Sequence, residues 1–80
     1  MPGIQELVAH MRQHPKGVRF RDAERVCVFY FGPARIHGSH HVFPMPWPDD
    51  PRINIQNRNG CVSPYQVKQI LAALDRLERP

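Results

Sequence analysis

The sequence predicts a two-layer α+β domain, in which helices pack against one small antiparallel sheet of two or three strands. Apolar residues recur at helical spacing in segments 4–11, 20–31 and 64–77, whereas β-branched and aromatic residues stand between turn formers in segment 34–56. A chain of 80 residues is the size of one small domain, with a single sheet layer to receive the helices. We therefore expect residues 1–80 to form one domain with the order α-α-β-β-β-α.

Two helices are expected before residue 34. Pro15 and Gly17 end the first after about three turns. Its apolar positions are Ile4, Leu7, Val8 and Met11. The segment 20–31 is ambiguous, because its second half, 26–31, also fits a buried strand. Its length and charged start favour a helix, and Gly32 followed by Pro33 is a strong stop signal.

Short strands are expected between Ala34 and Gln56. Prolines interrupt this region at positions 44, 46, 48 and 51, so a connecting loop that carries Trp47 is expected there. In the strand that follows, Ile53 and Ile55 face one side, and residues 52, 54 and 56 face the other. One face of the sheet is therefore predicted to be core and the other wet.

The last helix carries the clearest boundary signals. Ser63 is the expected N-cap, Pro64 the first helical residue, and Gln66 stands three positions after the cap, as in a capping box. Val62 and Val67 are spaced to form a hydrophobic staple. The stripe expected to be buried is Val67, Ile70, Leu71, Leu74 and Leu77.

The charge balance is basic. Eleven Lys and Arg against seven Asp and Glu give a formal charge of +4 and a pI near 9.7, which favours polyanionic partners. The basic residues are scattered, so a solvated mixed surface is an equally good interpretation. The apolar run 26–31 is far shorter than the roughly 18 residues of a membrane span, and no signal-peptide pattern opens the chain. We expect a soluble, cytoplasmic protein with Cys27 and Cys61 reduced and buried.

The most informative motif is the run 38–43, Gly-Ser-His-His-Val-Phe, which places an imidazole just after a flexible glycine at the start of a short apolar strand. Imidazole titrates near pH 6.5, so a histidine there can exchange protons at neutral pH. From this pattern alone, a strand-end histidine that packs or bonds to the backbone is the more common outcome for His40.

With three further segments, this motif resembles the HicA toxins over about Val18–Leu77. The segments are Ile53–Asn57, Asn59–Gly60 and Ser63–Val67. The resemblance implies a small mRNA interferase of a type II toxin–antitoxin system, with a fold similar to the double-stranded RNA-binding domain and a HicB antitoxin as partner. It also implies a catalytic site on His40, with Gly38 and Ser39, and no cofactor.

Cleavage of RNA needs a base for the 2′-hydroxyl and an acid for the departing oxygen, and one histidine supplies half of this. His41 supplies the other half only if the strand bends, since neighbouring strand residues point to opposite faces; otherwise an exposed surface imidazole is expected. Ser39, a backbone amide near Gly38, or a nearby Lys or Arg are the alternatives for stabilising the phosphorane charge. A metal site on the histidines at 37, 40 and 41 is disfavoured, because no Cys or carboxylate stands at ligand spacing.

Several residues are expected to contact RNA, with ordinary solvation as the competing interpretation. They are Arg35, His41, Arg52, Arg58 and Lys68. Trp47 either stacks on an unpaired base or covers the edge of the core, and the second role is favoured. Asn59 and Gly60 are typical of a tight turn and receive no chemical role.

Three departures from the family pattern stand out. His37 occupies a position where a lysine often precedes the glycine, and Met45 with Pro46 replaces a His-Pro pair. Arg19 stands where a Ser or Thr would cap the second helix. These differences keep a second function in view, a non-catalytic RNA-binding or antitoxin-binding module with the same fold, and more weakly a metal-dependent nuclease.

Overall fold

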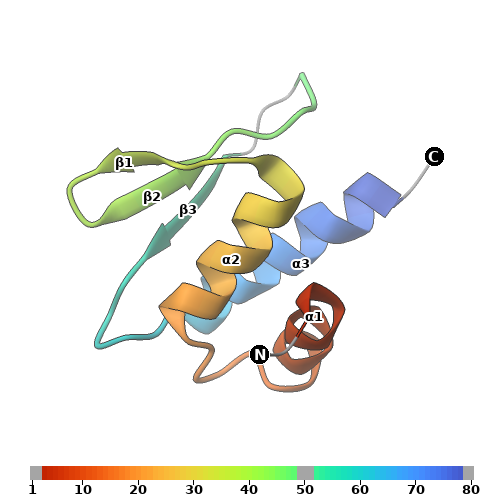
Figure 1. The fold of residues 1–80 in the computed structure, drawn as a ribbon, viewed down its shortest axis with the longest axis vertical. Coiled ribbons are helices and arrows are strands. Elements are labelled where there is room, and N and C mark those ends of the chain that lie inside the picture. Colours follow the sequence, from red (N-terminus) through yellow and green to blue (C-terminus); the bar gives the residue numbers. More distant parts are fainter. Residues whose placement is uncertain (1–2, 49–51, 79–80) are drawn as a thin grey trace.

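The computed structural model describes residues 3–48 and 52–78, and it confirms the α+β class (Figure 1). Three helices accompany one sheet of three strands. In chain order the elements are α1 (Ile4–Gln13), α2 (Phe20–Phe31), β1 (Arg35–His37), β2 (His40–Phe43), β3 (Ile53–Gln56) and α3 (Pro64–Glu78).

The sheet is antiparallel with the order β1-β2-β3. His40 on β2 stands opposite His37 on β1 and Gln56 on β3, and Val42 stands opposite Arg35 and Asn54. This register decides which side chains share a face, because directly paired residues project to the same side.

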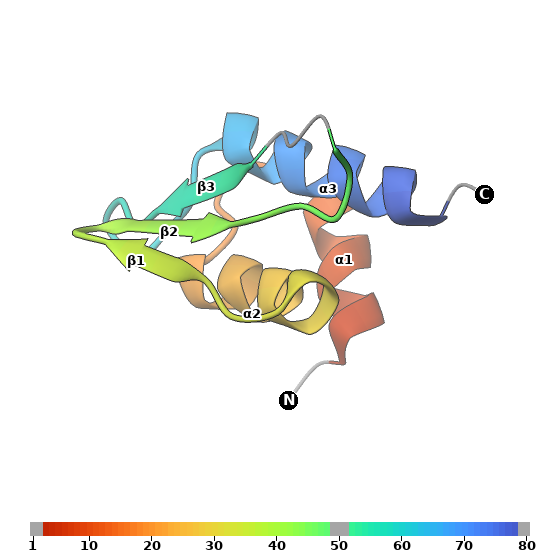
Figure 2. The same cartoon turned by 90° about the horizontal axis from the view of Figure 1, so that it is seen from above.

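All helices lie on one side of the sheet, as Figure 2 shows. α2 contacts β2 and β3, α3 contacts β3, and α1 packs on α2 and α3. The largest fully buried side chains come from both layers and include Phe43, Met11, Ile55 and Ile70. The described residues therefore share one core, and the opposite face of the sheet carries no helix.

Segment 20–31 is a helix, as its length and charged start predicted. Ala23, Val26 and Cys27 are fully buried, which is the helical spacing of a single stripe. The Arg19 side chain makes no cap hydrogen bond. Instead the Phe20 N–H donates to the Gly60 carbonyl at 2.9 Å, so a backbone bond to the turn before α3 satisfies one of the first donors of the helix.

α3 begins as predicted, with one difference at its cap. The Gln66 N–H donates to Ser63 Oγ at 3.3 Å, but Gln66 Oε1 accepts from the Gln56 N–H at 3.4 Å and so ties the helix to β3 instead of closing a capping box. The predicted stripe was wrong at Leu77, which is 37% exposed, while Ala73 is buried. Leu77 lies in the last turn, beyond the reach of the core.

Candidate functional site

The open face of the sheet is built by alternation along the three strands. Its side chains are Arg35 and His37 from β1, His40 and Val42 from β2, and Asn54 and Gln56 from β3. Phe43, Ile53 and Ile55 point the other way, into the core. The wet face expected for residues 54 and 56 is therefore confirmed, and it is the face that carries His40.

The turn between β1 and β2 consists of Gly38 and Ser39. Gly38 has φ +61°, and Ser39 is not among the described residues with positive φ. A glycine with positive φ at the first position of a two-residue loop is typical of a type II′ hairpin. Apart from its two chain neighbours, no residue has an atom within 4 Å of a Cβ placed on Gly38, so glycine is required there by the backbone conformation and not by crowding. Gly38 therefore positions its neighbours.

His40 is oriented by Asn54. Its Nδ1 lies 3.1 Å from Asn54 Oδ1, diagonally across the β2–β3 pair. A carbonyl oxygen only accepts hydrogen bonds, so Nδ1 donates and, in the neutral ring, Nε2 carries the lone pair. A partner on one ring nitrogen fixes the tautomer and the ring plane, as the orienting residue of a catalytic triad does. Nε2 of His40 is thereby prepared to accept a proton.

A chain of amide and hydroxyl groups supports the turn. Gln56 Nε2 donates to Ser39 Oγ at 3.1 Å, while the backbone N–H of Gln56 donates to Gln66 of α3. The Ser39 hydroxyl accepts in the first bond and keeps its own proton to donate. This chain joins the hairpin turn, the end of β3 and the first turn of α3.

His41 does not join His40. It projects to the helix side of the sheet, where Nδ1 contacts the Glu24 carboxylate and the ring packs edge-on against Phe20, with 4.9 Å between centroids. Its side chain is 20% exposed, so the expectation of a surface imidazole was wrong. The strand does not bend at this pair, and His41 stands apart from the open face.

His37 lies beside His40 as its direct partner across the hairpin. Side chains at such a position have Cβ atoms about 4.5–5.5 Å apart. Within residues 3–48 and 52–78, no three His, Cys, Asp or Glu side chains come together as metal ligands. The register places His37 as a second imidazole on the same face as His40.

The basic residues named from the sequence lie at different places. Arg35 and Arg52, with Val42 and Pro44, line a shallow hollow at the end of the open face away from the hairpin turn. Arg58 lies in the turn after β3, at the hairpin end. Lys68 is exposed on α3, and no contact among the described residues links it to His40. Arg35 and Arg52 are thus the pair that the fold brings together on the open face.

The two cysteines differ in exposure. Cys27 is fully buried in the core, and burial, with the nearby Glu24 carboxylate, raises the pKa of its thiol to about 12. Cys61 is only partly buried, in the turn before α3, so the prediction of burial was right for Cys27 and wrong for Cys61. Both are free thiols, and neither lies on the open face.

Sequence reasoning missed the residues that orient the site. Asn54 and Gln56 alternate with the buried Ile53 and Ile55, so their place on the wet face was readable. Their partners were not, because only the strand register brings Asn54 to His40 and Gln56 to Ser39.

Comparison with protein-family models, with curated proteins and with solved structures finds no match for this chain. Among the described residues, none of the helices is both long and apolar enough to span a membrane.

Proposed function

We propose that this chain is a metal-independent endoribonuclease of the HicA toxin type, with His40 as the group that moves the proton. One observation carries the proposal: His40 lies on an open sheet face with its Nδ1 bonded to Asn54 and its Nε2 left as the acceptor. The resemblance of segment 38–43 to the HicA motif supports the choice of RNA as substrate.

In the proposed reaction, the 2′-oxygen of a ribose attacks the adjacent phosphorus while Nε2 of His40 takes the hydroxyl proton. A new P–O2′ bond forms and the P–O5′ bond breaks, which leaves a 2′,3′-cyclic phosphate and a 5′-hydroxyl. The protonated imidazole of His37, opposite His40 in the hairpin, donates a proton to the departing O5′. The Ser39 hydroxyl donates a hydrogen bond to a phosphoryl oxygen as charge develops there.

Charge on the described elements supports a polyanionic substrate. The acidic residues of the described segments all lie on helices: Glu6, Asp22, Glu24, Asp75 and Glu78. Arg35 and Arg52 line the hollow on the open face. A strand of RNA that crosses this face meets the two arginines at one end and His40 at the other.

The proposal includes mRNA as substrate, a HicB-type antitoxin as protein partner and the cytoplasm as the site of action. These three parts rest on the resemblance. An antitoxin that covers the open face would separate His40 from RNA.

The test is induced expression of the native chain and of His40→Ala, with growth and RNA integrity as readouts. The matched control is His10→Ala, an exposed histidine on α1. We expect arrest and RNA cleavage with the native chain and the control, and neither with His40→Ala. Purified protein should cleave RNA in the presence of a chelator, leave cyclic phosphate ends, and leave a 2′-deoxy substrate intact.

Folded native protein that binds RNA and leaves it intact would refute this proposal and indicate a non-catalytic binding module. Activity that disappears with the chelator would indicate a metal-dependent nuclease instead.

A further inference from the structure

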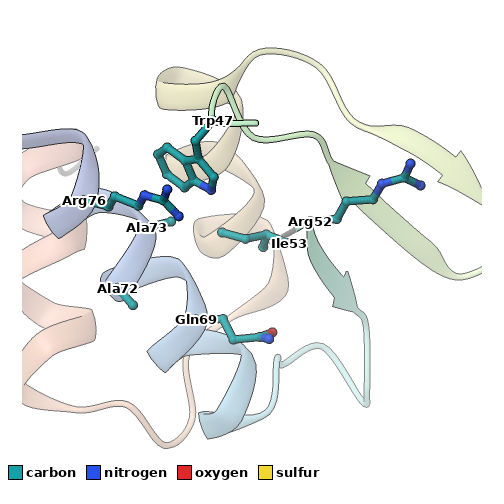
Figure 3. A pocket seen from close by; sticks show the side chains of 7 residues that line it. All are labelled: Trp47, Arg52, Ile53, Gln69, Ala72, Ala73 and Arg76. Carbon is teal, nitrogen blue, oxygen red and sulfur yellow. The ribbon is translucent and has the colours of Figure 1, made fainter. Parts of the chain in front are cut away.

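A cavity of about 220 Å³ lies between the proline loop, β3 and α3 (Figure 3). Trp47 lies at one end and Gln69 at the other, with Ile53 and Ala73 between them. None of the described residues that line it is acidic. Pockets that hold drug-sized ligands have volumes of roughly 300–1,000 Å³, so this smaller cavity suits a single small ring system.

The Trp47 end of the cavity is a stacked pair. The guanidinium carbon of Arg76 lies 4.4 Å from the centre of the indole ring. The indole Nε1–H is buried, and no hydrogen-bond partner is found for it among the described residues. Indole and guanidinium planes are the groups on which proteins stack unpaired bases. This end of the cavity therefore offers a flat, cationic surface.

Gln69 provides a polar group at the other end. Its Nε2 donates to the Tyr65 hydroxyl at 3.4 Å. The carboxamide oxygen remains an acceptor. An acceptor of this kind suits the exocyclic amino group of adenine, cytosine or guanine.

Arg52 connects the cavity to the open face. It lines both this cavity and the shallow hollow that it shares with Arg35. In Figure 3 its side chain points away from Trp47 and toward the sheet. A strand of RNA whose phosphates lie along the open face thus passes the mouth of the cavity at Arg52.

We propose that this cavity is a nucleobase subsite, which takes one unpaired base of the RNA strand against Trp47 and Arg76. The inference rests on the proposed function, from which it takes the RNA strand, and it assigns to the molecule a second point of contact away from His40. A subsite of this kind would set the sequence context in which the chain cleaves.

The test uses the emission of Trp47, which is the single tryptophan of the chain and therefore reports on this cavity. The probes are a 2′-O-methyl hexaadenylate, which lacks the attacking hydroxyl, and an abasic hexamer with the same phosphates. We expect the hexaadenylate to quench Trp47 and to bind about 5- to 150-fold more tightly than the abasic chain, the range expected for stacking one base.

The matched variants are Ala72→Leu and Ala9→Leu. Both replace an exposed helical alanine with another good helix former, but only Ala72 lines the cavity. Ala72→Leu should abolish the quenching and the advantage of the base-bearing probe, and Ala9→Leu should retain both. Circular dichroism should show native helix content in each.

Equal affinity for the two probes, an unchanged Trp47 emission, or an Ala72→Leu variant that binds as the native chain does would each overturn the subsite. If no oligonucleotide changes the Trp47 emission, the cavity does not bind a base, and a side chain of a protein partner becomes the alternative occupant. The two proposals fail separately: cleavage that depends on His40 survives loss of the subsite, and quenching by hexaadenylate survives loss of cleavage.

Discussion

Asn54 contacts His40 from an exposed position of β3, so its replacement changes the site without touching the core. Asn54→Ala frees the imidazole to rotate and to change tautomer. We expect the rate of RNA cleavage to fall about 10- to 100-fold, by analogy with the loss of a residue that orients a metal-bound histidine. The free energy of unfolding should change by less than about 0.5 kcal/mol. Single-turnover cleavage and urea unfolding measure the two quantities.

Gln13→Ala on α1 is the control for Asn54→Ala, since it removes an exposed amide far from the sheet. Cleavage by Asn54→Ala at the native rate would show that Asn54 does not orient His40.

Burial of the Cys27 thiol makes the stability of the molecule fall at alkaline pH. Its thiol has a pKa raised from 9.0 to about 12 in the fold, so the folded state keeps the proton at pH values where the unfolded state loses it. The stabilisation is complete below pH 9 and is lost as the pH rises from 9 toward 12, by up to about 1.4 kcal/mol per pH unit. Urea unfolding of the native chain and of Cys27→Ala across this window measures the effect.

The Cys27→Ala chain should be less stable than the native chain below pH 9, because it leaves a cavity, and its stability should fall less steeply above pH 9. Parallel curves for the two chains would contradict the assignment to Cys27.

At the scale of elements, the β1–β2 hairpin depends on Gly38. Its φ of +61° is a conformation that costs other residues about 1–3 kcal/mol, so Gly38→Ala should lower the free energy of unfolding by that amount. Ser39→Ala, at the neighbouring position, should cost less than about 0.5 kcal/mol. Urea unfolding of the two variants compares them. Equal costs would show that the turn does not require glycine.

α1 is held mainly by apolar packing. Met11 is 1% exposed, whereas the Arg12–Asp75 ion pair, with 2.8 Å between its atoms, joins side chains that are 42% and 47% exposed. Met11→Ala should cost about 2–5 kcal/mol of unfolding free energy, and Arg12→Ala less than about 1 kcal/mol. Thermal and urea unfolding give both values, and a larger cost for Arg12→Ala would reverse this account of α1.

At the scale of the whole molecule, the described acidic residues lie away from the open face of the sheet. The helices cover one face of the sheet and carry the described acidic residues, and the open face bears Arg35, Arg52 and two imidazoles. The logarithm of the binding constant for single-stranded RNA should therefore fall linearly with the logarithm of the salt concentration. Arg52→Ala should reduce that slope by about 0.7, the value for one phosphate contact.

Arg21→Ala is the control for this measurement, because Arg21 is exposed on α2, behind the sheet. Equal salt-dependence slopes for Arg52→Ala and the native chain would show that Arg52 does not contact a phosphate, whatever the outcome for cleavage.

Local patterns in the sequence predicted much of the fold. The spacing of apolar residues predicted α1 and α3, and period two placed Ile53 and Ile55 in the core. The prolines at 44, 46 and 48 predicted the loop after β2, whereas Pro51 lies outside the described residues. The same patterns failed where a distant partner decides. Leu77 has the spacing of the buried helical stripe but lies past the end of the core and is exposed. Gln66 has the spacing of a capping box, but its side chain accepts a hydrogen bond from β3.

The sequence by itself determined the α+β class and the element order, because these depend on neighbours within a few positions along the chain. The choice of His40 as candidate proton-transfer residue came from the resemblance of segment 38–43 to the HicA motif. The tertiary structure alone decided the composition of the site. Strand register turned His41 toward Glu24, set His37 and Asn54 beside His40, and left Arg35 and Arg52 at the far end of the open face. Register is a relation between segments that lie apart in the chain, and no local pattern encodes which residues it pairs.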